Sequence, residues 1–321
     1  MATTQQKQTH GKYEHLMAKC QGLAPVRTAV AHPCSDSALA AAVEAANLRL
    51  IDAILVGPEK KIRGAAAAGR LNIEKLHIVD QPHSHAAADK AVELVRRGEA
   101  ELLMKGSLHT DELMAAVVAR ETGLRTARRI SHVFLMDVPT YHKTLAVTDA
   151  AINIFPTLED KVDIVQNAID LLRTLGLEQP KVALLSAVET VTQKIPSTID
   201  AAALCKMADR GQITGALLDG PLAFDNAISA EAAREKHIKS DVAGDPDILL
   251  VPDLEAGNIL AKQLTFLVGA DAAGIVLGAR VPIILTSRAD SVRARLASCA
   301  VGMLLAHARR TGAVSATAGG A

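Results

Sequence analysis

The chain has 321 residues, of which 49% are apolar and 22% are charged, and its 35 basic and 35 acidic residues cancel. A zero net charge argues against an electrostatic binder of DNA or RNA, because such proteins are usually strongly basic. Aromatic residues make up only 2% of the chain, so platforms for base stacking have almost no side chains available. The length suffices for about two domains with sizeable cores.

The cysteine pattern and the N-terminal residues indicate in which cellular compartment the protein is expected. The four cysteines form no C-x-x-C pair and no metal-ligand spacing: Cys20, Cys34, Cys205 and Cys299. Free thiols in a reducing cytoplasm fit this scatter. The N-terminus lacks the apolar stretch of a secretory signal, and no run approaches the ~18 apolar residues of a membrane helix. We therefore expect a cytoplasmic protein without a membrane partner or a metal.

The first half of the chain alternates short apolar runs with helical stretches. Strands are expected at 26–32, 52–56, 77–80, 101–106, 131–138 and 143–153. A helix follows each of the first four strands, and Ser35 or Asp36 is placed to cap the first of these helices. The last two strands follow each other without a helix between them.

The second half resumes the alternation. Thr157 with Asp160, and Ser197 with Asp200, have the spacing of capping boxes that open helices. Strands are expected at 181–187, 214–220, 247–253, 274–278 and 281–287. Continuous Val, Ile and Leu runs separated by helices favour an α/β fold, with mostly parallel strands covered by helices on both faces.

The border between domains is indicated only weakly. No repeat of fixed period and no low-complexity linker divides the chain. The paired strands at 131–153 give the best indication of a border, and we expect the last strand and helix to return to the first domain. The first domain then comprises 1–135 plus 281–321, and the second comprises 136–280.

Several familiar motifs are absent or incomplete. Gly64 and Gly69 have the spacing of a Walker A loop, but the Lys and the Ser or Thr of that loop are missing. No G-x-G-x-x-G follows a strand, and no G-x-S-x-G is present, which weakens dinucleotide-binding and hydrolase interpretations. His83 and His85 lie in a polar loop without a partner acid or cysteine, so we interpret them as solvated.

Four expected strand ends carry unusual polar residues, at 105–111, 219–225, 251–262 and 285–291. Ligands of parallel α/β proteins bind beyond such ends, where helix N-termini point at them. Each segment alone is explained by helix capping or a turn, but capping does not require the charged and amide side chains found together here: Lys105, Asn258, Lys262 and Arg288. An arginine opposes the dipole at a helix N-terminus and suits a bidentate anion instead. The residues thus predict an anion-binding α/β enzyme.

The same segments resemble the phosphate acetyl/butyryltransferase family, and the resemblance covers most of the chain. Three stretches carry it by their order and spacing: DGPLAFDNAISAEAAREK, VAGDPDILLVPDLEAGNILAKQL and VPIILTSRADS. Within them, PDLEAGN is the most specific part. Residues 101–116 resemble the family segment in which a Gly precedes a His and a hydroxyl-bearing residue, and residues 147–167 resemble its segment at the domain crossover.

The resemblance implies a two-domain, three-layer α/β/α subunit related to isocitrate and isopropylmalate dehydrogenases, usually a homodimer, with its active site in the interdomain cleft. It implies a reversible reaction of acyl-CoA with inorganic phosphate, which gives acyl phosphate and CoA. Coenzyme A is then a substrate and product, and no metal or other cofactor is required. We expect direct transfer in a ternary complex. Acetyl and butyryl groups both stay open as substrates, although the SRADS segment is more similar to the butyryl branch.

The resemblance also implies roles for individual residues. Ser287 and Arg288 match the Ser-Arg pair that contacts phosphate in the family. Acetyl-specific members carry an acidic residue on the following helix, assigned as base toward the CoA thiol, but residues 292–295 contain no carboxylate. We therefore expect Asp290 or Glu255 to exchange the proton with the thiol.

Other residues are expected to bind the oxyanion and CoA. Asn258, Lys262 or a backbone N–H near Gly257 is placed to stabilise the oxyanion that forms at the thioester carbonyl. Two further groups are assigned to CoA: Arg125, Arg128 and Arg129 beside the crossover, and Ser107, His109 and Thr110 after a strand. A solvated run of charge explains the three arginines equally well.

Two rival functions stay open. A dehydrogenase of the same superfold, acting on an isocitrate- or isopropylmalate-like acid, would need clustered aspartates for a divalent metal, and Asp219, Asp225 and Asp253 are candidates. Reduction of NAD(P) would reveal that activity. A CoA-binding protein without catalysis is the other rival, and the intact LTSRADS and PDLEAGN segments argue against it. None of the four cysteines is needed as a nucleophile.

Overall fold

The computed structural model describes residues 11–286 and 290–312. Its strands are β1 (Val26–Ala31), β2 (Ile51–Gly57), β3 (His77–Asp80), β4 (Leu102–Lys105), β5 (Ser131–Asp137), β6 (Leu145–Thr148), β7 (Lys181–Leu185), β8 (Leu217–Leu222), β9 (Ile248–Leu250), β10 (Asp271–Leu277) and β11 (Ile283–Ile284). Its helices are α1 (Lys12–Lys19), α2 (Asp36–Asn47), α3 (Glu59–Ala68), α4 (Ser84–Arg96), α5 (Thr110–Val118), α6 (Leu158–Thr174), α7 (Pro196–Asp209), α8 (Phe224–Ile228), α9 (Ala230–Glu235), α10 (Leu254–Leu267) and α11 (Val292–Arg310).

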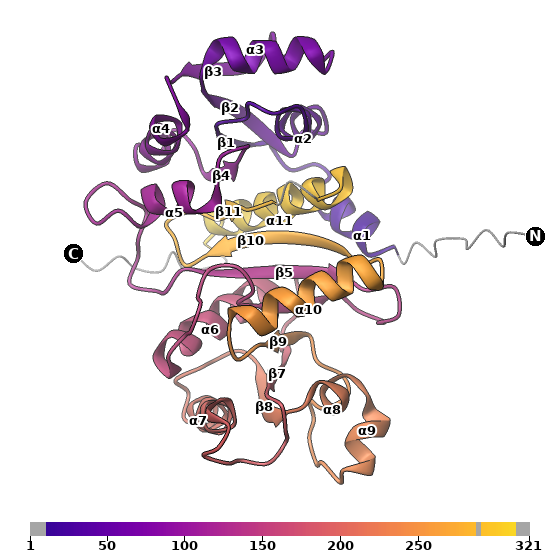
Figure 1. The fold of residues 1–321 in the computed structure, drawn as a ribbon. Coiled ribbons are helices and arrows are strands. Elements are labelled where there is room, and N and C mark those ends of the chain that lie inside the picture. Colours follow the sequence, from indigo (N-terminus) through magenta and orange to yellow (C-terminus); the bar gives the residue numbers. More distant parts are fainter. Residues whose placement is uncertain (1–10, 287–289, 313–321) are drawn as a thin grey trace, which may run out of the picture.

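These strands form one sheet of eleven, in the order β3-β2-β1-β4-β11-β10-β5-β6-β9-β7-β8. Figure 1 shows the sheet running from β3 near the top of the view to β8 near the bottom. Most neighbours are parallel, but β10 is antiparallel to both β11 and β5, and β5 is antiparallel to β6. The expected α/β class is confirmed. The two successive strands expected before and after residue 140 pair directly as β5 and β6.

Three expected strands are much shorter than the sequence suggested, and the one expected at 247–253 is paired only over Ile248–Leu250. The strand expected at 281–287 is β-paired only over Ile283–Ile284. The strand expected at 143–153 ends at Thr148, because the Asp149 side chain accepts hydrogen bonds from the backbone N–H groups of Ala151 and Ile152, at 2.9 and 3.0 Å. An aspartate that bonds the backbone two residues ahead favours a turn over a strand.

One of the two expected capping boxes is confirmed. At the start of α6, the Thr157 hydroxyl accepts from the Asp160 backbone N–H at 3.2 Å, and the Asp160 carboxylate accepts from the Thr157 N–H at 3.0 Å. The box expected at Ser197 is wrong, because α7 already begins at Pro196. Proline is favoured at the first helical position, and the Ser197 hydroxyl is hydrogen-bonded to that of Ser186 instead.

The two faces of the sheet carry different hydrophobic clusters. On one face, a single cluster runs from Leu39 in α2, through Ile275 in β10, to Leu204 in α7, and α6 and α11 pack on it. On the other face, one cluster lies with α4 and α5 and another with α8 and α10. Figure 1 shows α10 in front of the central strands. The change between these two clusters falls at β5, since Ile130, directly before this strand, belongs to the cluster with α4 and α5, and Met136 belongs to the cluster with α8 and α10.

A single sheet thus joins the two expected domains, 1–135 plus 281–321 and 136–280. After β10 the chain returns to the first half, because β11 pairs with β4 and α11 packs against α2. The division into two domains stays a prediction.

Candidate active site

The carboxyl ends of β4 and β11 lie side by side because the two strands pair in parallel. Lys105, the last residue of β4, is only 6% exposed, and its ammonium nitrogen lies 3.4 Å from the backbone oxygen of Thr286. A buried charge is costly unless polar groups or an opposite charge compensate it. The structure therefore places a positive charge beside the residue that precedes Ser287. Ser287 and Arg288, predicted to hold phosphate, lie outside the described residues.

Asp290 is half-buried in the loop that leads into α11. Ser291 caps the helix, because its hydroxyl accepts a hydrogen bond from the Ala294 backbone N–H at 3.1 Å. A helix N-terminus carries partial positive charge and unpaired N–H donors. The start of α11 therefore adds an anion-attracting element directly after the segment predicted to hold phosphate.

Ser107 joins the loops that follow β1 and β4. Its hydroxyl donates to the backbone oxygen of His32 at 2.7 Å and accepts from the backbone N–H of Cys34 at 3.2 Å. Gly106 permits this close approach, since a Cβ there would lie 2.3 Å from the oxygen of Ala31. Burial raises the pKa of the Cys34 thiol to about 11, so this cysteine is a poor nucleophile at neutral pH. Ser107, predicted to bind CoA, thus also has a structural role.

His109 and Thr110, also predicted to bind CoA, lie at the start of α5. His109 is the N-cap residue, and its backbone N–H donates to the Glu112 carboxylate at 3.1 Å. The His109 side chain is exposed, and Thr110 is half-buried. Both side chains therefore flank a second helix N-terminus, four to five residues beyond the end of β4.

Three predicted residues lie on α10. Its N-cap Asp253 accepts a hydrogen bond from a backbone N–H of the first turn at 2.9 Å. The amide nitrogen of Asn258 donates to the backbone oxygen of Ala150 at 3.1 Å, so Asn258 anchors the helix to the loop after β6. Glu255 and Lys262 are exposed. Of the three, only Asn258 has a side-chain hydrogen bond to another of the described residues.

The loop after β6 connects Asn258 to Arg129. The buried Asp149 carboxylate accepts a hydrogen bond from the Asn153 side-chain amide at 2.6 Å, and Asn153 in turn accepts from the Arg129 guanidinium at 2.7 Å. Burial raises the pKa of Asp149, and the hydrogen bonds from the loop act against that rise. Because Ala150 belongs to the same loop, the structure brings two separately predicted residues to one element.

The three predicted arginines differ in their surroundings. Arg128 forms an ion pair with Asp170 at 2.6 Å, and Arg129 forms one with Asp160 at 3.2 Å. Arg125 is exposed and pairs with no carboxylate among the residues that the structure describes. Arg125 therefore stays a candidate for binding an anion, and its assignment to CoA stays a prediction.

His132 on β5 was not predicted from the sequence. It is fully buried, and within the described part of the chain neither ring nitrogen has a hydrogen-bond partner. The ring packs against Phe134 with centroids 4.3 Å apart, and it occupies space left by Gly274, where a Cβ would lie 3.0 Å from Nε2. Burial lowers the pKa of His132 to about 3, so the imidazole is neutral at neutral pH. No motif surrounds this residue, and only the fold reveals its burial.

The aspartates considered for a metal serve separate purposes. Asp219 accepts from the N–H of Gly220 at 2.8 Å, Asp225 pairs with Lys236 at 3.3 Å, and Asp253 caps α10. Across 11–286 and 290–312, no group of three His, Cys, Asp or Glu side chains is arranged to hold a metal ion. None of the helices in these ranges is long and apolar enough to cross a membrane.

The sequence is similar to known phosphate acyltransferases. The family model described as "Phosphate acetyl/butaryl transferase" matches residues 83–302. A phosphate acetyltransferase of Rhizobium meliloti is 68% identical over 305 residues, which cover 95% of this chain and 96% of that protein. A phosphate butyryltransferase of Clostridium acetobutylicum is 40% identical over 294 residues, which cover 92% of this chain and 98% of that protein.

Solved structures agree with the sequence comparisons. A branched-chain phosphotransacylase from Enterococcus faecalis V583 matches with a TM-score of 0.77 and 32% identity, over 88% of this chain and 99% of that one. A putative 4-hydroxythreonine-4-phosphate dehydrogenase from Salmonella typhimurium matches with a TM-score of 0.54 and 13% identity, over 88% of this chain and 100% of that one, which shows a likeness of fold alone. The family model covers more than half of the chain and the acetyltransferase nearly all of it, so this protein belongs to the phosphate acetyl/butyryl transferase family.

Proposed function

We propose that this protein catalyses the reversible transfer of an acetyl group from acetyl-CoA to inorganic phosphate, which gives acetyl phosphate and CoA. The 68% identity to a phosphate acetyltransferase over 95% of the chain carries this proposal. The likeness of the SRADS segment to the butyryl branch favours a butyryl group instead. The butyryltransferase relative is only 40% identical, however, so we favour acetyl over butyryl.

The reaction begins when a phosphate oxygen attacks the thioester carbonyl. A C–O bond forms, the carbonyl oxygen becomes an oxyanion, and the C–S bond then breaks to release the CoA thiolate, which takes up a proton. Ser287, Arg288 and the N-terminus of α11 hold the phosphate in this scheme, and direct transfer needs no covalent enzyme intermediate. The buried ammonium of Lys105 adds positive charge from the neighbouring strand end.

The remaining roles follow from placement. Asp290 adjoins the phosphate segment and is half-buried, so it is a better candidate than the exposed Glu255 to exchange a proton with the thiol. An amide nitrogen has two N–H donors, and Asn258 directs one at Ala150, which leaves the other for the oxyanion. Lys262, the alternative to Asn258 as a donor to the oxyanion, is exposed one turn further along α10.

Binding of CoA is assigned to Arg125 and to the start of α5, at His109 and Thr110.

We further propose that the fold is that of the isocitrate and isopropylmalate dehydrogenases, with the active site in a cleft between two domains. We also propose a homodimeric assembly and a cytoplasmic location. The antiparallel strands at the centre of one continuous sheet and the likeness to a dehydrogenase of low identity support the fold. The unpaired cysteines are in keeping with the compartment.

The decisive experiment measures release of free CoA thiol from acetyl-, propionyl- and butyryl-CoA, with and without phosphate. We expect a phosphate-dependent rate that is highest with acetyl-CoA. A maximum at butyryl-CoA would overturn the acyl preference but keep the reaction. No release from any of the three would overturn the reaction itself, and NAD(P) reduction with a hydroxy acid would then favour the dehydrogenase.

Replacement of Arg288 by Ala tests the phosphate site. We expect Arg288→Ala to lose at least ~100-fold in phosphate-dependent rate, because a charge-assisted donor at the reacting group is removed. The circular dichroism spectrum and the melting temperature should stay those of the wild type. Arg63→Ala is the matched control, since Arg63 is exposed on α3 and forms an ion pair with Glu59 of the same helix. Full activity in Arg288→Ala would remove this residue from the mechanism.

A further inference from the structure

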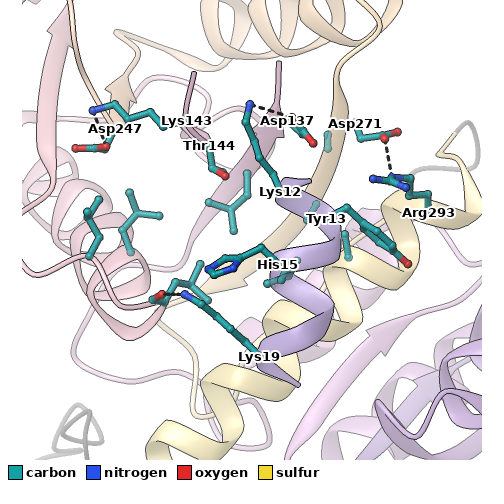
Figure 2. Close-up of a pocket in the computed structure, with 18 residues that line it drawn as sticks. Lys12, Tyr13, His15, Lys19, Asp137, Lys143, Thr144, Asp247, Asp271 and Arg293 are labelled. Atoms are coloured by element: carbon teal, nitrogen blue, oxygen red, sulfur yellow. Dashed lines mark hydrogen bonds and ion pairs between the residues drawn. The ribbon is translucent and has the colours of Figure 1, made fainter. Parts of the chain in front are cut away.

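A cavity of about 260 Å³ lies beneath α1, on the face of the sheet opposite α10. Figure 2 shows the side chains that line it. Leu135, Leu172, Ala273 and Ala297 form part of its wall, and all four belong to the hydrophobic cluster on which α11 packs. Helix α10 packs on a different cluster, across the sheet. The cavity, here called the α1 cavity, is therefore separate from Asn258 and the other α10 residues.

Helix α1 covers this cavity without filling it. Lys12, His15, Leu16 and Lys19 line it, and their spacing of three, four and seven residues places them on one face of the helix. No residue of α1 is fully buried. Both ends of the helix are held by hydrogen bonds. Lys12 donates to the backbone oxygen of Tyr141 at 2.9 Å, and Lys19 donates to the backbone oxygen of Leu175. An apolar space thus remains between the helix and the cluster beneath it.

The charged side chains around the α1 cavity already have partners. The ion pairs at its edge are Lys12 with Asp137 at 2.9 Å, Lys143 with Asp247 at 2.8 Å, and Arg293 with Asp271 at 3.1 Å. The remaining cation, Lys19, donates to the backbone oxygen of Leu175. A charged ligand would compete with these bonds, whereas a neutral ligand would leave them intact. His15 points toward the cavity in Figure 2, and its side chain has no hydrogen-bond partner among the described residues. It offers one polar contact to a ligand.

We propose that the α1 cavity binds a small, uncharged and mainly apolar molecule that carries one hydroxyl or carbonyl group. Cavities of ~150 Å³ lined by aliphatic side chains stay dry and take up molecules the size of benzene. The α1 cavity is larger and, unlike those cavities, partly open to solvent, so it has room for a short aliphatic chain or a single ring. The His15 imidazole contacts the polar end of the ligand, and Leu135 and Leu172 contact its apolar part.

The test titrates the full chain with primary alcohols from butanol to octanol and with the matching carboxylates, by calorimetry. We expect each added methylene to tighten alcohol binding ~4-fold until the cavity is full, because burial of a methylene is favourable by a constant increment. The carboxylates should bind at least ~10-fold more weakly, because a carboxylate gives up its hydration in an apolar space where the lining cations are already bonded to the protein. This readout does not depend on acyl transfer, so it stands apart from the proposed function.

Variants locate the site. Ala297→Leu and Leu172→Phe each place extra carbon atoms in the cavity and should abolish alcohol binding. Ala18→Leu is the matched control, because Ala18 is exposed on α1 and does not line the cavity. No binding of any alcohol, equal binding of the carboxylates, or unchanged binding in both filled variants would overturn the proposal. If the wild type binds no alcohol and a cavity-filling variant dissociates an oligomer, the cavity belongs to a contact between subunits. That outcome would also overturn the proposal.

Discussion

Several residues singled out from the sequence as substrate contacts also hold the protein itself together. Ser107 joins two loops, Arg129 contacts Asn153, and Asn258 contacts Ala150. A side chain fixed by such bonds meets its substrate without first losing conformational freedom, which favours catalysis. Polar residues at strand ends thus cap helices and join loops, and their roles toward a substrate stay predictions.

His132 predicts a dependence of stability on pH. Burial lowers its pKa from 6.5 to about 3 in the folded chain, so below pH ~6.5 the unfolded chain takes up a proton that the folded chain does not. This contribution to unfolding is absent above pH ~6.5 and grows as the pH falls toward about 3. We expect His132→Leu to lose less melting temperature than the wild type between pH 7.5 and pH 5.0.

The control for this prediction is His77→Leu, because His77 is exposed on β3. Its melting temperature should fall with pH as steeply as that of the wild type. Equal slopes for His132→Leu and the wild type would show that His132 takes up its proton as readily in the folded chain as in the unfolded one.

At the scale of single elements, local sequence determined most starts and ends. The capping box at Thr157 sets the start of α6, because both of its hydrogen bonds lie within four consecutive residues. The error at Ser197 has a local cause as well, since Pro196 suits the first helical position better than a serine cap placed after it. The early end of β6 was missed because it depends on how the buried Asp149 folds back on its own loop.

Gly257 is the element-scale position with the clearest consequence for the site. A Cβ there would lie 2.7 Å from Val251 Cγ2 and 2.8 Å from the oxygen of Asp149, so Gly257→Ala must displace α10 from the loop after β6. Asn258 would move with it. We expect kcat for acyl transfer to fall at least ~10-fold, since small misplacements of reacting groups are costly. A steady-state assay at saturating substrate measures this.

Gly64→Ala, in helix α3, is the matched control for Gly257→Ala, because nothing lies within 4 Å of the added Cβ. Alanine is favoured over glycine inside a helix by up to ~1 kcal/mol, so this variant should be as stable as the wild type or more stable, with unchanged kcat. An unchanged kcat in Gly257→Ala would remove the close approach of α10 from the account of the site.

At the scale of the whole molecule, one sheet and one of its hydrophobic clusters unite the two halves of the chain. The cluster on the α11 face includes Leu39 in the first half and Leu204 in the second, with exposures of 0% and 1%. The opposite face is divided between two clusters. We therefore expect cooperative unfolding to depend on the face with the continuous cluster. The opposite face, on which α5 and α10 lie, has a break between its two clusters.

This arrangement predicts one cooperative unfolding transition. Leu39→Ala and Leu204→Ala should each lower the same melting temperature, because each removes ~2–5 kcal/mol of burial from a shared core. Differential scanning calorimetry measures the number of transitions. Leu48→Ala, at a residue 49% exposed, is the control and should have little effect. Two separate transitions, each sensitive to only one variant, would instead support domains that fold independently.

The sequence by itself determined the α/β class, the alternation of strands and helices, and the family. These are properties of short segments, since periodicity, capping and motifs such as PDLEAGN are read within a few tens of residues. Only the tertiary structure decided which strand ends meet. Lys105 lies beside Thr286, 181 residues away, because β11 inserts next to β4. The burial of His132 and the α1 cavity likewise arise from the packing of distant segments, which no local pattern encodes.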